Sequence, residues 1–529
     1  MALDKFIPDI VTTGSDTSSE ELHYTRRGEV LEQNAFVEDS IEGYDAERMQ
    51  ARMSLSAADE KKLLRRIDWH LMPLCALMFL AKNLDSSNVS NVKIMNKGTD
   101  QNILTQLSMT ANEYNLVTTV YYIPYIVFEA PSNLLIKRLL PSRWQSRIMV
   151  TWGAALACHA AVTSKQGLYI ARFFLGLAEA GMFPGVILQM TYWYRPDEMS
   201  LRLLYFYMLG NFSGVISGLL AYAFNGVSGH GSLSGWQWMF LVEGIATVIF
   251  GIALFFILPD FPTQAKWLTD KEKAFIQARL PSNAPLASEM NFNYREILVA
   301  LKDKKLWLFT LIWACLTIGT SGLTFYQPTV IANLGFTSIG QSQLLNIPTA
   351  VLTIITIAVF GIWADSARLP RPLYPLFFLV VILSCYSVLY TFPSNGGVYA
   401  ATVISNAMAS SWYPMMWPWR VQTTERATGS AFSIGFVNSY GQIGGAIGPQ
   451  LFRSQYAPHY TTSFAVAMAM IGGAIVFTLI TWVVTWDTEK RTRKLKLARI
   501  EAAKREECIL DDVDIHANSK DHLKTEHRV

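Results

Sequence analysis

Charged residues are scarce in this chain. They make up 16% of its 529 residues, whereas roughly 25% is usual for soluble domains. Hydrophobic residues make up 51%, and the formal net charge is only +3. No basic stripe interleaves with aromatic residues, which argues against a nucleic-acid partner. This balance indicates a chain that lies mostly in lipid rather than in water.

Cysteine and histidine are few, and their spacing suits neither a disulfide framework nor a metal site. None of the five cysteines forms a CxxC pair, and the eight histidines form neither HExxH nor HxxxH. Core packing is therefore the default interpretation of the cysteines, and no metal or other cofactor is expected. The first residues, MALDKFIPDI, lack a basic stretch followed by an apolar run. No cleaved signal peptide is expected.

Apolar segments of about 20 residues recur along the chain, and this is the length that a helix needs to cross a bilayer. Several contain Gly and Pro in their interiors, as membrane helices tolerate. The pattern predicts an all-α membrane protein with about twelve transmembrane helices. The predicted spans are 69–90, 112–136, 146–163, 167–190, 203–224, 237–258, 306–327, 343–364, 373–391, 396–417, 431–453 and 464–486.

Basic residues set the predicted orientation. They precede the first span and follow the second, fourth, eighth, tenth and twelfth, while the alternate loops hold few cations. The positive-inside rule then puts both termini in the cytoplasm. A polar segment separates two parallel six-helix halves around a central cavity. The predicted units are a disordered acidic tail (1–64), an N-terminal half (65–258), a cytoplasmic linker (259–305), a C-terminal half (306–488) and a C-terminal tail (489–529).

Particular motifs strengthen this interpretation. NLDSSNVSNVKI begins at Asn83, FEAPSNLLIKR at Phe128 and RFFLGLAEAGMFPG at Arg172; GWQWMFLVEG and GIWAD follow later. With this layout, the chain resembles the major facilitator superfamily. Within it, the motifs are similar to those of the anion:cation symporter family, and especially of the fungal allantoate and nicotinate permeases. The resemblance implies the major facilitator fold.

Three ionisable residues lie inside predicted spans. Asp85 is in the first span, where a carboxylate is costly unless it is protonated or paired. Arg172 and Glu179 lie on the fourth span, about 10.5 Å apart along one face. The resemblance implies proton coupling for Asp85 and Glu179, and Arg172 offers a fork that matches a substrate carboxylate. Alternatively, Asp85 sits at the water interface or pairs structurally with Arg172, and the three residues form a buried ion-pair network.

One residue departs from the family pattern. Many family members have Arg directly after the first-helix Asp, and this chain has Ser86. If that Arg holds a second negative charge, its absence favours a monoanionic substrate. Alternatively, Arg172 alone suffices, and Ser86 is only a change of size.

The polar groups predicted inside the C-terminal half are uncharged. Tyr326 and Gln327 on the seventh span and Asn438 and Gln442 on the eleventh are candidate substrate contacts, together with Asn88 on the first. Charge in one half and neutral or aromatic recognition in the other suits an aromatic or heterocyclic carboxylate. Trp417 and Trp419 are interpreted as packing and interfacial residues, and the glycine-rich segment GQIGGAIGP as a close helix contact.

Two loop residues are candidates for a gate. Asp365, in GIWAD, and Arg138, at the end of the second span, are expected to latch the cytoplasmic side, as the family's loop motif does. The first-half copy of the motif has no Asp at the expected place.

The favoured function is proton-driven symport that imports a small organic anion, with allantoate, nicotinate and pantothenate as example substrates. The alternative is export of an organic acid or secondary metabolite. A receptor or a membrane enzyme is disfavoured, because no clustered catalytic groups or metal ligands occur. The expected partners are the substrate anion, protons and the bilayer. The plasma membrane is the favoured location, and a monomer is expected.

Overall fold

The described part of the chain is almost entirely helical. The computed structural model describes residues 24–27, 46–136, 138–195, 197–229, 232–280, 294–335, 338–421, 427–457 and 459–509. Within these ranges two three-residue strands accompany the helices. The remaining residues include most of the predicted N-terminal tail, the end of the C-terminal tail and part of the linker, and those predictions lie outside the described residues.

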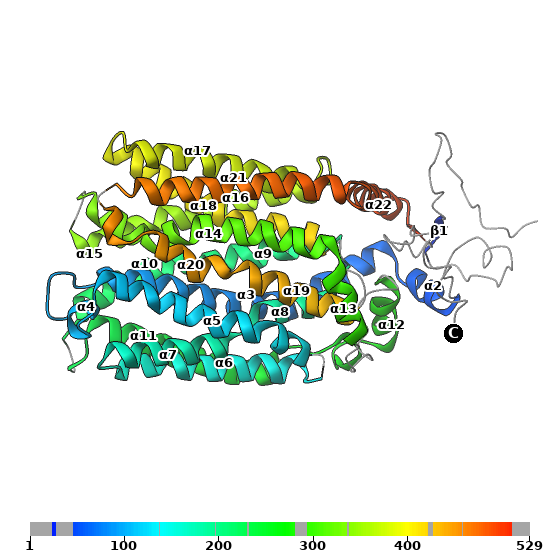
Figure 1. Cartoon of the computed structure of the whole chain (residues 1–529). Helices are drawn as coiled ribbons and strands as arrows, with labels where there is room; N and C mark the ends of the chain where they lie inside the picture. The colour runs from blue at the N-terminus through cyan, green and yellow to red at the C-terminus, as the bar shows by residue number, and fades with distance from the viewer. Residues whose placement is uncertain are drawn as a thin grey trace, which may run out of the picture.

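The long helices form one bundle and run roughly along its axis (Figure 1). The N-terminal helices are α3 (Ala57–Ile94), α5 (Ala111–Leu135), α6 (Pro141–Ala157), α7 (Lys165–Glu179), α8 (Met182–Thr191), α9 (Met199–Asn211), α10 (Ser213–Val227) and α11 (Gly235–Ile257). The C-terminal helices are α14 (Lys304–Asn333), α16 (Ile347–Asp365), α17 (Leu373–Thr391), α18 (Asn395–Val421), α19 (Ala427–Gly441), α20 (Ile443–Leu451) and α21 (Thr461–Val484).

Local sequence explains where several helices begin. Ser56 accepts a hydrogen bond from the backbone N–H of Asp59 at the start of α3, and Thr110 and Glu113 form a capping box at the start of α5. α7 stops at Glu179, and Gly181 follows with φ +94° before α8 begins. This left-handed conformation suits glycine, and a Cβ there would overlap the side chain of Ser132. The chain therefore breaks directly after a candidate site residue.

Large apolar side chains cover the outside of the bundle. Phe256 on α11 is 78% exposed and Val483 on α21 is 76% exposed. Seven helical stretches of the described residues are long and apolar enough to cross a membrane. An apolar surface of this extent suits lipid and would be unstable in water. The helices at the other five predicted spans, α3, α5, α6, α18 and α19–α20, are outside this group.

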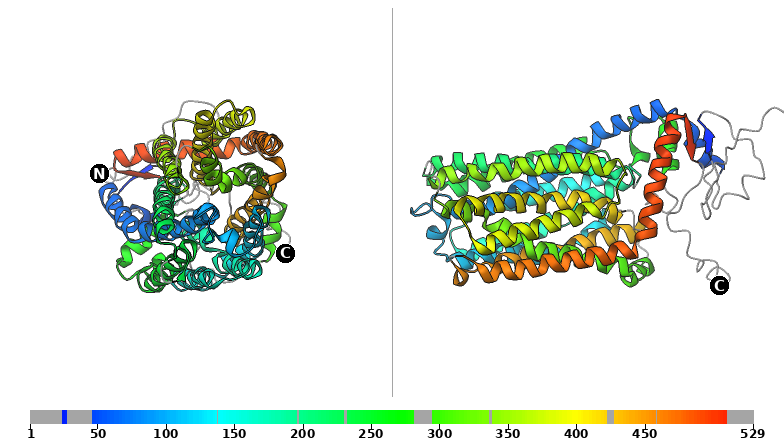
Figure 2. Two further views of the ribbon diagram at one scale, coloured as in Figure 1. Left: turned by 90° about the vertical axis from the view of Figure 1, so that its left-hand side faces the viewer. Right: turned by 90° about the horizontal axis from the view of Figure 1, so that it is seen from above.

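Two groups of helices meet along the bundle. The N-terminal helices pack mainly on one another, and so do the C-terminal helices. The groups touch where α3 and α5 contact α14, α19 and α20, and where α9 and α10 contact α16 and α18. The end-on view in Figure 2 shows the helices arranged around a central region.

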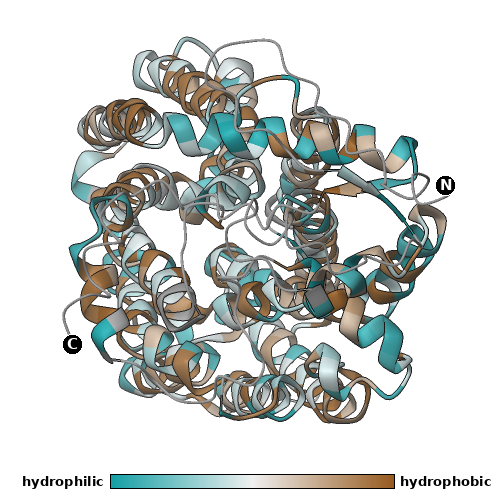
Figure 3. Ribbon diagram, turned by 90° about the vertical axis from the view of Figure 1, so that its right-hand side faces the viewer, coloured by the Kyte–Doolittle hydropathy of each residue, from teal (hydrophilic) through white to brown (hydrophobic). Residues whose placement is uncertain are grey.

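One end of the bundle, called here the tail end, carries additional elements. They are β1 (Tyr24–Arg26), α2 (Ala46–Met53), α12 (Asp270–Arg279), α13 (Tyr294–Lys302), α22 (Trp486–Lys504) and β2 (Glu507–Ile509). α22 turns across the bundle (Figure 2), and hydrophilic residues gather on these elements (Figure 3). The opposite end is called the far end.

Part of the segment predicted as a disordered tail is ordered. Residues 46–53 form α2, and 57–64 form the first turns of α3. Arg48 and Arg52 of α2 donate hydrogen bonds to the carbonyl oxygens of Leu280 (2.6 Å) and Ala278 (2.5 Å) at the end of α12. These tertiary contacts hold a segment whose composition is that of a solvated tail.

Candidate functional site

A cavity of about 360 Å³ lies between the N-terminal and C-terminal helices. α3, α5, α8, α9 and α10 contribute one wall, and α14, α16, α18, α19 and α20 contribute the other. Seven aromatic side chains line it: Phe79, Tyr122, Tyr125, Phe183, Tyr207, Phe325 and Tyr413. Mixed aromatic and polar walls of this size suit a small organic ligand.

Lys82 brings a positive charge to this cavity. Among the described residues that line the cavity, it is the one with a charged side chain. Its side chain is 16% exposed, and its Nζ lies 3.8 Å from Oε1 of Glu179 and 5.8 Å from the ring centroid of Tyr125. A lysine in apolar surroundings is stabilised by an anion or by an aromatic face, and Lys82 has both.

Glu179 lies directly behind Lys82. It is the last residue of α7, its side chain is 1% exposed, and its Oε1 accepts no hydrogen bond from the described residues. A buried carboxylate oxygen without a hydrogen bond depends on its neighbouring cation. The charge states of Glu179 and Lys82 are therefore linked.

Asp85 and Arg172 form a second buried pair, deeper in the N-terminal helices. Arg172 Nη1 lies 3.6 Å from Oδ1 of Asp85, and both side chains are 3% exposed. Trp152 Nε1 donates a hydrogen bond to Asp85 (3.3 Å), and the Arg172 guanidinium lies 5.1 Å from the ring centroid of Phe240. Neither Asp85 nor Arg172 lines the cavity in this conformation.

A chain of hydrogen bonds links this interior to the cavity wall. Asn88, fully buried, donates to Glu243 through its Nδ2 and accepts from Ser217 Oγ (2.5 Å) through its Oδ1. Asn91 Nδ2 donates to the same Ser217 hydroxyl (2.7 Å). Ser217 and Asn91 line the cavity, whereas Asn88 lies one step behind them.

The opposite wall presents amide groups. Asn406 donates to Gln327 Oε1 (2.6 Å), and Gln327 Nε2 donates to Thr349 (2.7 Å). Asn438 Nδ2 donates to Oε1 of Glu129 on α5 (2.5 Å). Gln442 also lines the cavity, and its amide makes no side-chain hydrogen bond to the described residues. These groups can recognise a neutral polar ligand atom from the C-terminal side.

Tyr326 lies apart from the cavity, at the contact between the two groups of helices near the far end. Its hydroxyl exchanges hydrogen bonds with the amide of Asn115 (2.7 and 3.0 Å). Its ring lies 4.1 Å from Nζ of Lys93. Near the tail end, Phe183 and Trp417 pack across the same boundary, with ring centroids 5.6 Å apart. The two groups of helices therefore touch on both sides of the cavity.

The two predicted gate residues lie at the tail end. Asp365, the last residue of α16, forms an ion pair with Lys496 of α22 (2.5 Å). Arg138 follows the end of α5 and is exposed. Trp417 and Trp419, interpreted as packing residues, are at most 1% exposed.

Neither Lys82 nor Glu129 is among the site residues predicted from the sequence. Both lie inside the predicted first and second spans, and a charged residue inside a membrane span is by default a functional candidate. Glu129 is fully buried and bonds across the boundary to Asn438. A search for charged residues inside the predicted spans would have identified both residues.

Comparison with known proteins identifies related chains. The model of the Major Facilitator Superfamily matches residues 73–449. The MFS-type transporter cnsO of Penicillium expansum is 30% identical over 460 residues, which is 84% of this chain and 87% of the relative. A metabolite transport protein of Pseudomonas putida, NicT, is 33% identical over 313 residues, 58% of this chain and 68% of NicT.

A solved structure has the same fold. The xylose transporter XylE from E. coli, in a partially occluded inward-open conformation, superposes with a TM-score of 0.56 at 15% identity. The match covers 77% of this chain and 96% of that chain. At this identity the likeness concerns the fold alone.

Proposed function

The chain belongs to the Major Facilitator Superfamily, and we propose that it is a proton-coupled symporter that takes up a small organic monoanion. The observation that carries this proposal is the ion pair between Lys82 on the cavity wall and the buried Glu179 behind it. The chain is a multi-pass membrane transporter rather than an enzyme. The substrate and its coupling to protons are the proposal.

We propose twelve spans in two halves, 65–258 and 306–488, joined by a cytoplasmic linker, 259–305. The tail end faces the cytoplasm, because nine Lys and Arg side chains line a second cavity there and basic residues favour that side. The plasma membrane is the proposed location. The proposed spans lie within α3, α5, α6, α7–α8, α9–α10, α11, α14, α16, α17, α18, α19–α20 and α21, and the first turns of α3 lie outside the membrane at the tail end.

Lys82 is the proposed anchor for the substrate carboxylate. Arg172 was the candidate from sequence, but its guanidinium is behind the wall and already paired with Asp85. Arg172 and Asp85 then act as a neutral pair that supports the wall, and they exchange partners with the cavity only if the helices rearrange. Gln327, Asn438 and Gln442 face the rest of the substrate from the other wall.

Charge neutrality explains why the proton and the anion would move together. In the empty carrier, Lys82 and an ionised Glu179 neutralise each other. In the loaded carrier, Lys82 pairs with the substrate carboxylate, and Glu179 has taken up a proton. In each of these two states the buried groups carry no net charge. An anion or a proton bound alone would leave one charge uncompensated in a closed cavity. The expected stoichiometry is one proton per monoanion.

The cavity composition favours a compact ring-bearing monocarboxylate. Lys82 supplies one positive charge, and Ser86 lines the wall at the position where many family members carry Arg. The aromatic side chains supply flat apolar contacts for a ring. A dianion would find only one cation among the described lining residues, so monoanions are preferred.

The test is radiotracer uptake of a panel of mono- and dicarboxylates in a strain that lacks its own carriers. We expect Lys82→Gln to lower uptake by about 30-fold or more, because removing one partner of a buried charge pair costs about 2–5 kcal/mol. Lys82→Arg should keep part of the activity. Lys97→Gln removes the same charge from an exposed position near the end of α3 and serves as the control.

The double variant Lys82→Gln/Glu179→Gln removes both charges of this pair, so neither partner is left unpaired, and it should fold without binding carboxylate. Wild-type uptake by Lys82→Gln would contradict the proposed anchor. In vesicles with an imposed proton gradient, accumulation of the substrate on the side into which protons flow supports symport. Substrate movement against the direction of proton flow would instead indicate export.

A further inference from the structure

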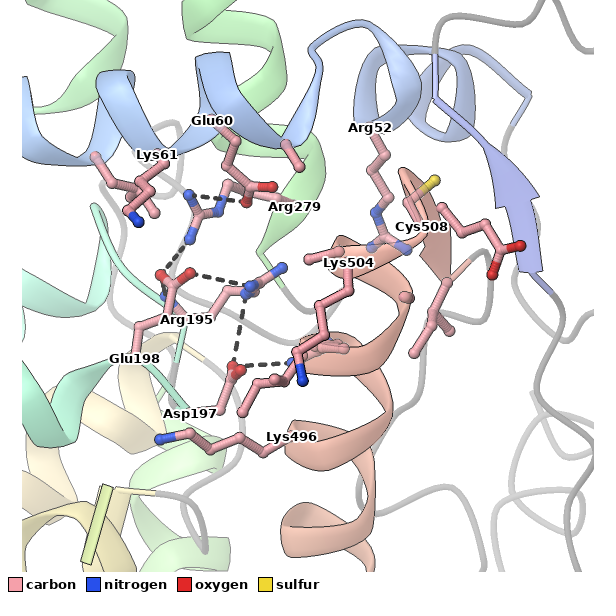
Figure 4. A pocket seen from close by; sticks show the side chains of 18 of the residues that line it. Arg52, Glu60, Lys61, Arg195, Asp197, Glu198, Arg279, Lys496, Lys504 and Cys508 are labelled. Carbon is pink, nitrogen blue, oxygen red and sulfur yellow. Dashed lines mark hydrogen bonds and ion pairs between the residues drawn. The ribbon is translucent and has the colours of Figure 1, made fainter. Parts of the chain in front are cut away.

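A second, larger cavity of about 560 Å³ lies at the tail end (Figure 4). Segments far apart in sequence build it: the first turns of α3, the loop between α8 and α9, α12, and α22. β1 and β2 close one side, because residues 24–26 pair antiparallel with residues 507–509. Arg27 adds to this closure with a hydrogen bond to the carbonyl oxygen of Leu55 (3.3 Å). The cavity is separate from the central one and is absent from the proposed transport mechanism.

The lining of this cavity has an excess of positive charge. Nine Lys and Arg and five Asp and Glu residues line it. Each of the five carboxylates already has a cationic partner; for example, Glu60 pairs with Arg27 (2.7 Å) and Asp197 with Arg499 (2.8 Å). The surplus cations are therefore not compensated from within the lining.

Several donors in this cavity lack an acceptor. Nε of Arg279 is buried and makes no hydrogen bond to the described part of the chain, and the Arg279 side chain is 2% exposed. Nε of Arg195 makes no hydrogen bond either, but it lies 3.5 Å from Oδ1 of Asp197 in an ion pair. Lys61 of α3 and Lys504 of α22 form no ion pair with the described residues. Figure 4 shows the Lys504 and Lys496 side chains extending from α22 into the space beside Asp197.

Positive potential also acts on the acidic residues of the lining. Burial alone would raise the pKa of Glu60, but the nearby Arg279, Arg195 and Arg27 lower it to about 2. The pKa of Asp197 is likewise held well below its usual range by Arg499 and Arg195, against the effect of burial. The field that lowers these pKa values would also attract a free anion.

From these contacts we infer that the tail-end cavity is a binding site for a small multivalent anion that carries phosphate groups. The Arg279 guanidinium, whose Nε–H makes no hydrogen bond to the described residues, can donate to a phosphate oxygen, and lysines at the rim add point charges. The volume suits a pyrophosphate-bearing molecule. A bound anion would bridge Lys61 on α3 to Lys504 on α22, and so would join the N-terminal helices to the element that follows α21.

An anion bound in the tail-end cavity would inhibit transport. In the alternating-access motion expected of this fold, the two groups of helices must separate at one end and then at the other. An anion that bridges α3 and α22 favours the conformation in which the tail end is closed. At ten times its Kd, such a ligand would leave about one carrier in eleven free to open.

The experiment uses the purified full-length chain and pyrophosphate as the probe, with sulfate and citrate at matched ionic strength. We expect pyrophosphate to raise the midpoint of thermal unfolding saturably, by about 2–3 °C at a hundredfold excess over Kd. Lys61→Gln/Lys504→Gln should abolish the shift. The matched control, Lys271→Gln/Lys494→Gln, removes two exposed lysines outside the cavity lining and should keep it.

A second arm distinguishes the source of the phosphate. The same variants are compared in nanodiscs with and without a phosphoinositide lipid. A shift with pyrophosphate in lipid-free detergent assigns a soluble ligand, and a shift only with the phosphoinositide assigns a lipid headgroup. Equal shifts with sulfate or citrate, no shift with either phosphate source, or equal loss in the control variant would overturn the inference. Because the measurement reports binding, the inferred anion site is tested independently of carboxylate transport.

Discussion

At the residue scale, the two faces of α3 contact different parts of the molecule. Lys82 and Ser86 are four residues apart and lie on the face that lines the cavity. Asp85 and Asn88 are three residues apart and point into the N-terminal helices, where they meet Arg172 and Glu243. Neighbouring residues on a helix differ by about 100° in direction, so one turn can serve both sides.

Glu179 is the residue on which the proposed coupling depends. We expect Glu179→Gln to remove the acceleration of uptake by external acidity. Protonation of Glu179 releases Lys82 from the ion pair, and an amide cannot take up or release that proton. Exchange of labelled for unlabelled substrate should persist, since the substituted amide mimics the protonated carboxyl and leaves Lys82 free to bind the carboxylate. Uptake at acidic and neutral external pH is the measurement.

Glu113→Gln, at the start of α5, is the control for this prediction, because it changes a partly exposed carboxylate outside the cavity lining. Uptake by Glu179→Gln that still rises with acidity would remove Glu179 from the coupling role. In that case Asp85 would be the next carboxylate to substitute.

At the element scale, the break between α7 and α8 positions Glu179. Gly181 has φ +94° and packs against Ser132 of α5. The break therefore sets both the end of α7 and the close approach of α5, whose Tyr125 ring faces Lys82.

Gly181→Ala should disturb this arrangement. We expect it to destabilise the chain by about 1–3 kcal/mol from the left-handed backbone alone, with a further cost from the overlap with Ser132. Thermal unfolding and uptake measure the effect. Gly472→Ala, at a helical glycine with open space around it, is the control and should be neutral or slightly stabilising. Wild-type stability and uptake in Gly181→Ala would show that the break is dispensable.

At the scale of the whole molecule, the neutral loaded and empty states predict electroneutral transport. We expect an inward proton gradient to drive uptake of a monocarboxylate into proteoliposomes, and a membrane potential set with potassium and valinomycin to leave the rate unchanged. Charge movement measured on a solid-supported membrane should be small. Strong dependence on the potential would contradict one proton per monoanion.

The ion pairs at the tail end predict a pH-dependent stability. Because arginines lower the pKa of Glu60 from 4.5 to about 2, its carboxylate stabilises the folded chain above pH 4.5, and this contribution is lost as the pH falls toward 2. We expect Glu60→Gln to cost about 3 kcal/mol at neutral pH, measured in buffer without phosphate.

The difference between wild type and Glu60→Gln should shrink as the pH falls through this window, because the wild-type carboxylate then becomes neutral too. Glu501→Gln, at an exposed position of α22, is the control and should change little. A difference that is independent of pH would mean that packing, not charge, accounts for the loss.

The sequence by itself determined the class of protein and its mostly helical, membrane-spanning character. Apolar runs of membrane length, basic loops and the family motifs require no knowledge of packing, because bilayer thickness fixes the helix length. They predicted a membrane transporter of the superfamily whose model matches the chain. The charged residues of the first and fourth spans were also visible, because charge inside such runs is rare.

Only the tertiary structure decided which of these charges faces the cavity. Arg172 was the expected anion site, yet it is buried against Phe240 and Asp85, while Lys82 lines the wall. The sequence predicted neither the ordered helix α2 nor the tail-end cavity, because their contacts join residues hundreds of positions apart. Spacing along one helix fixes relative directions, but the direction that faces the cavity depends on which helices pack against it.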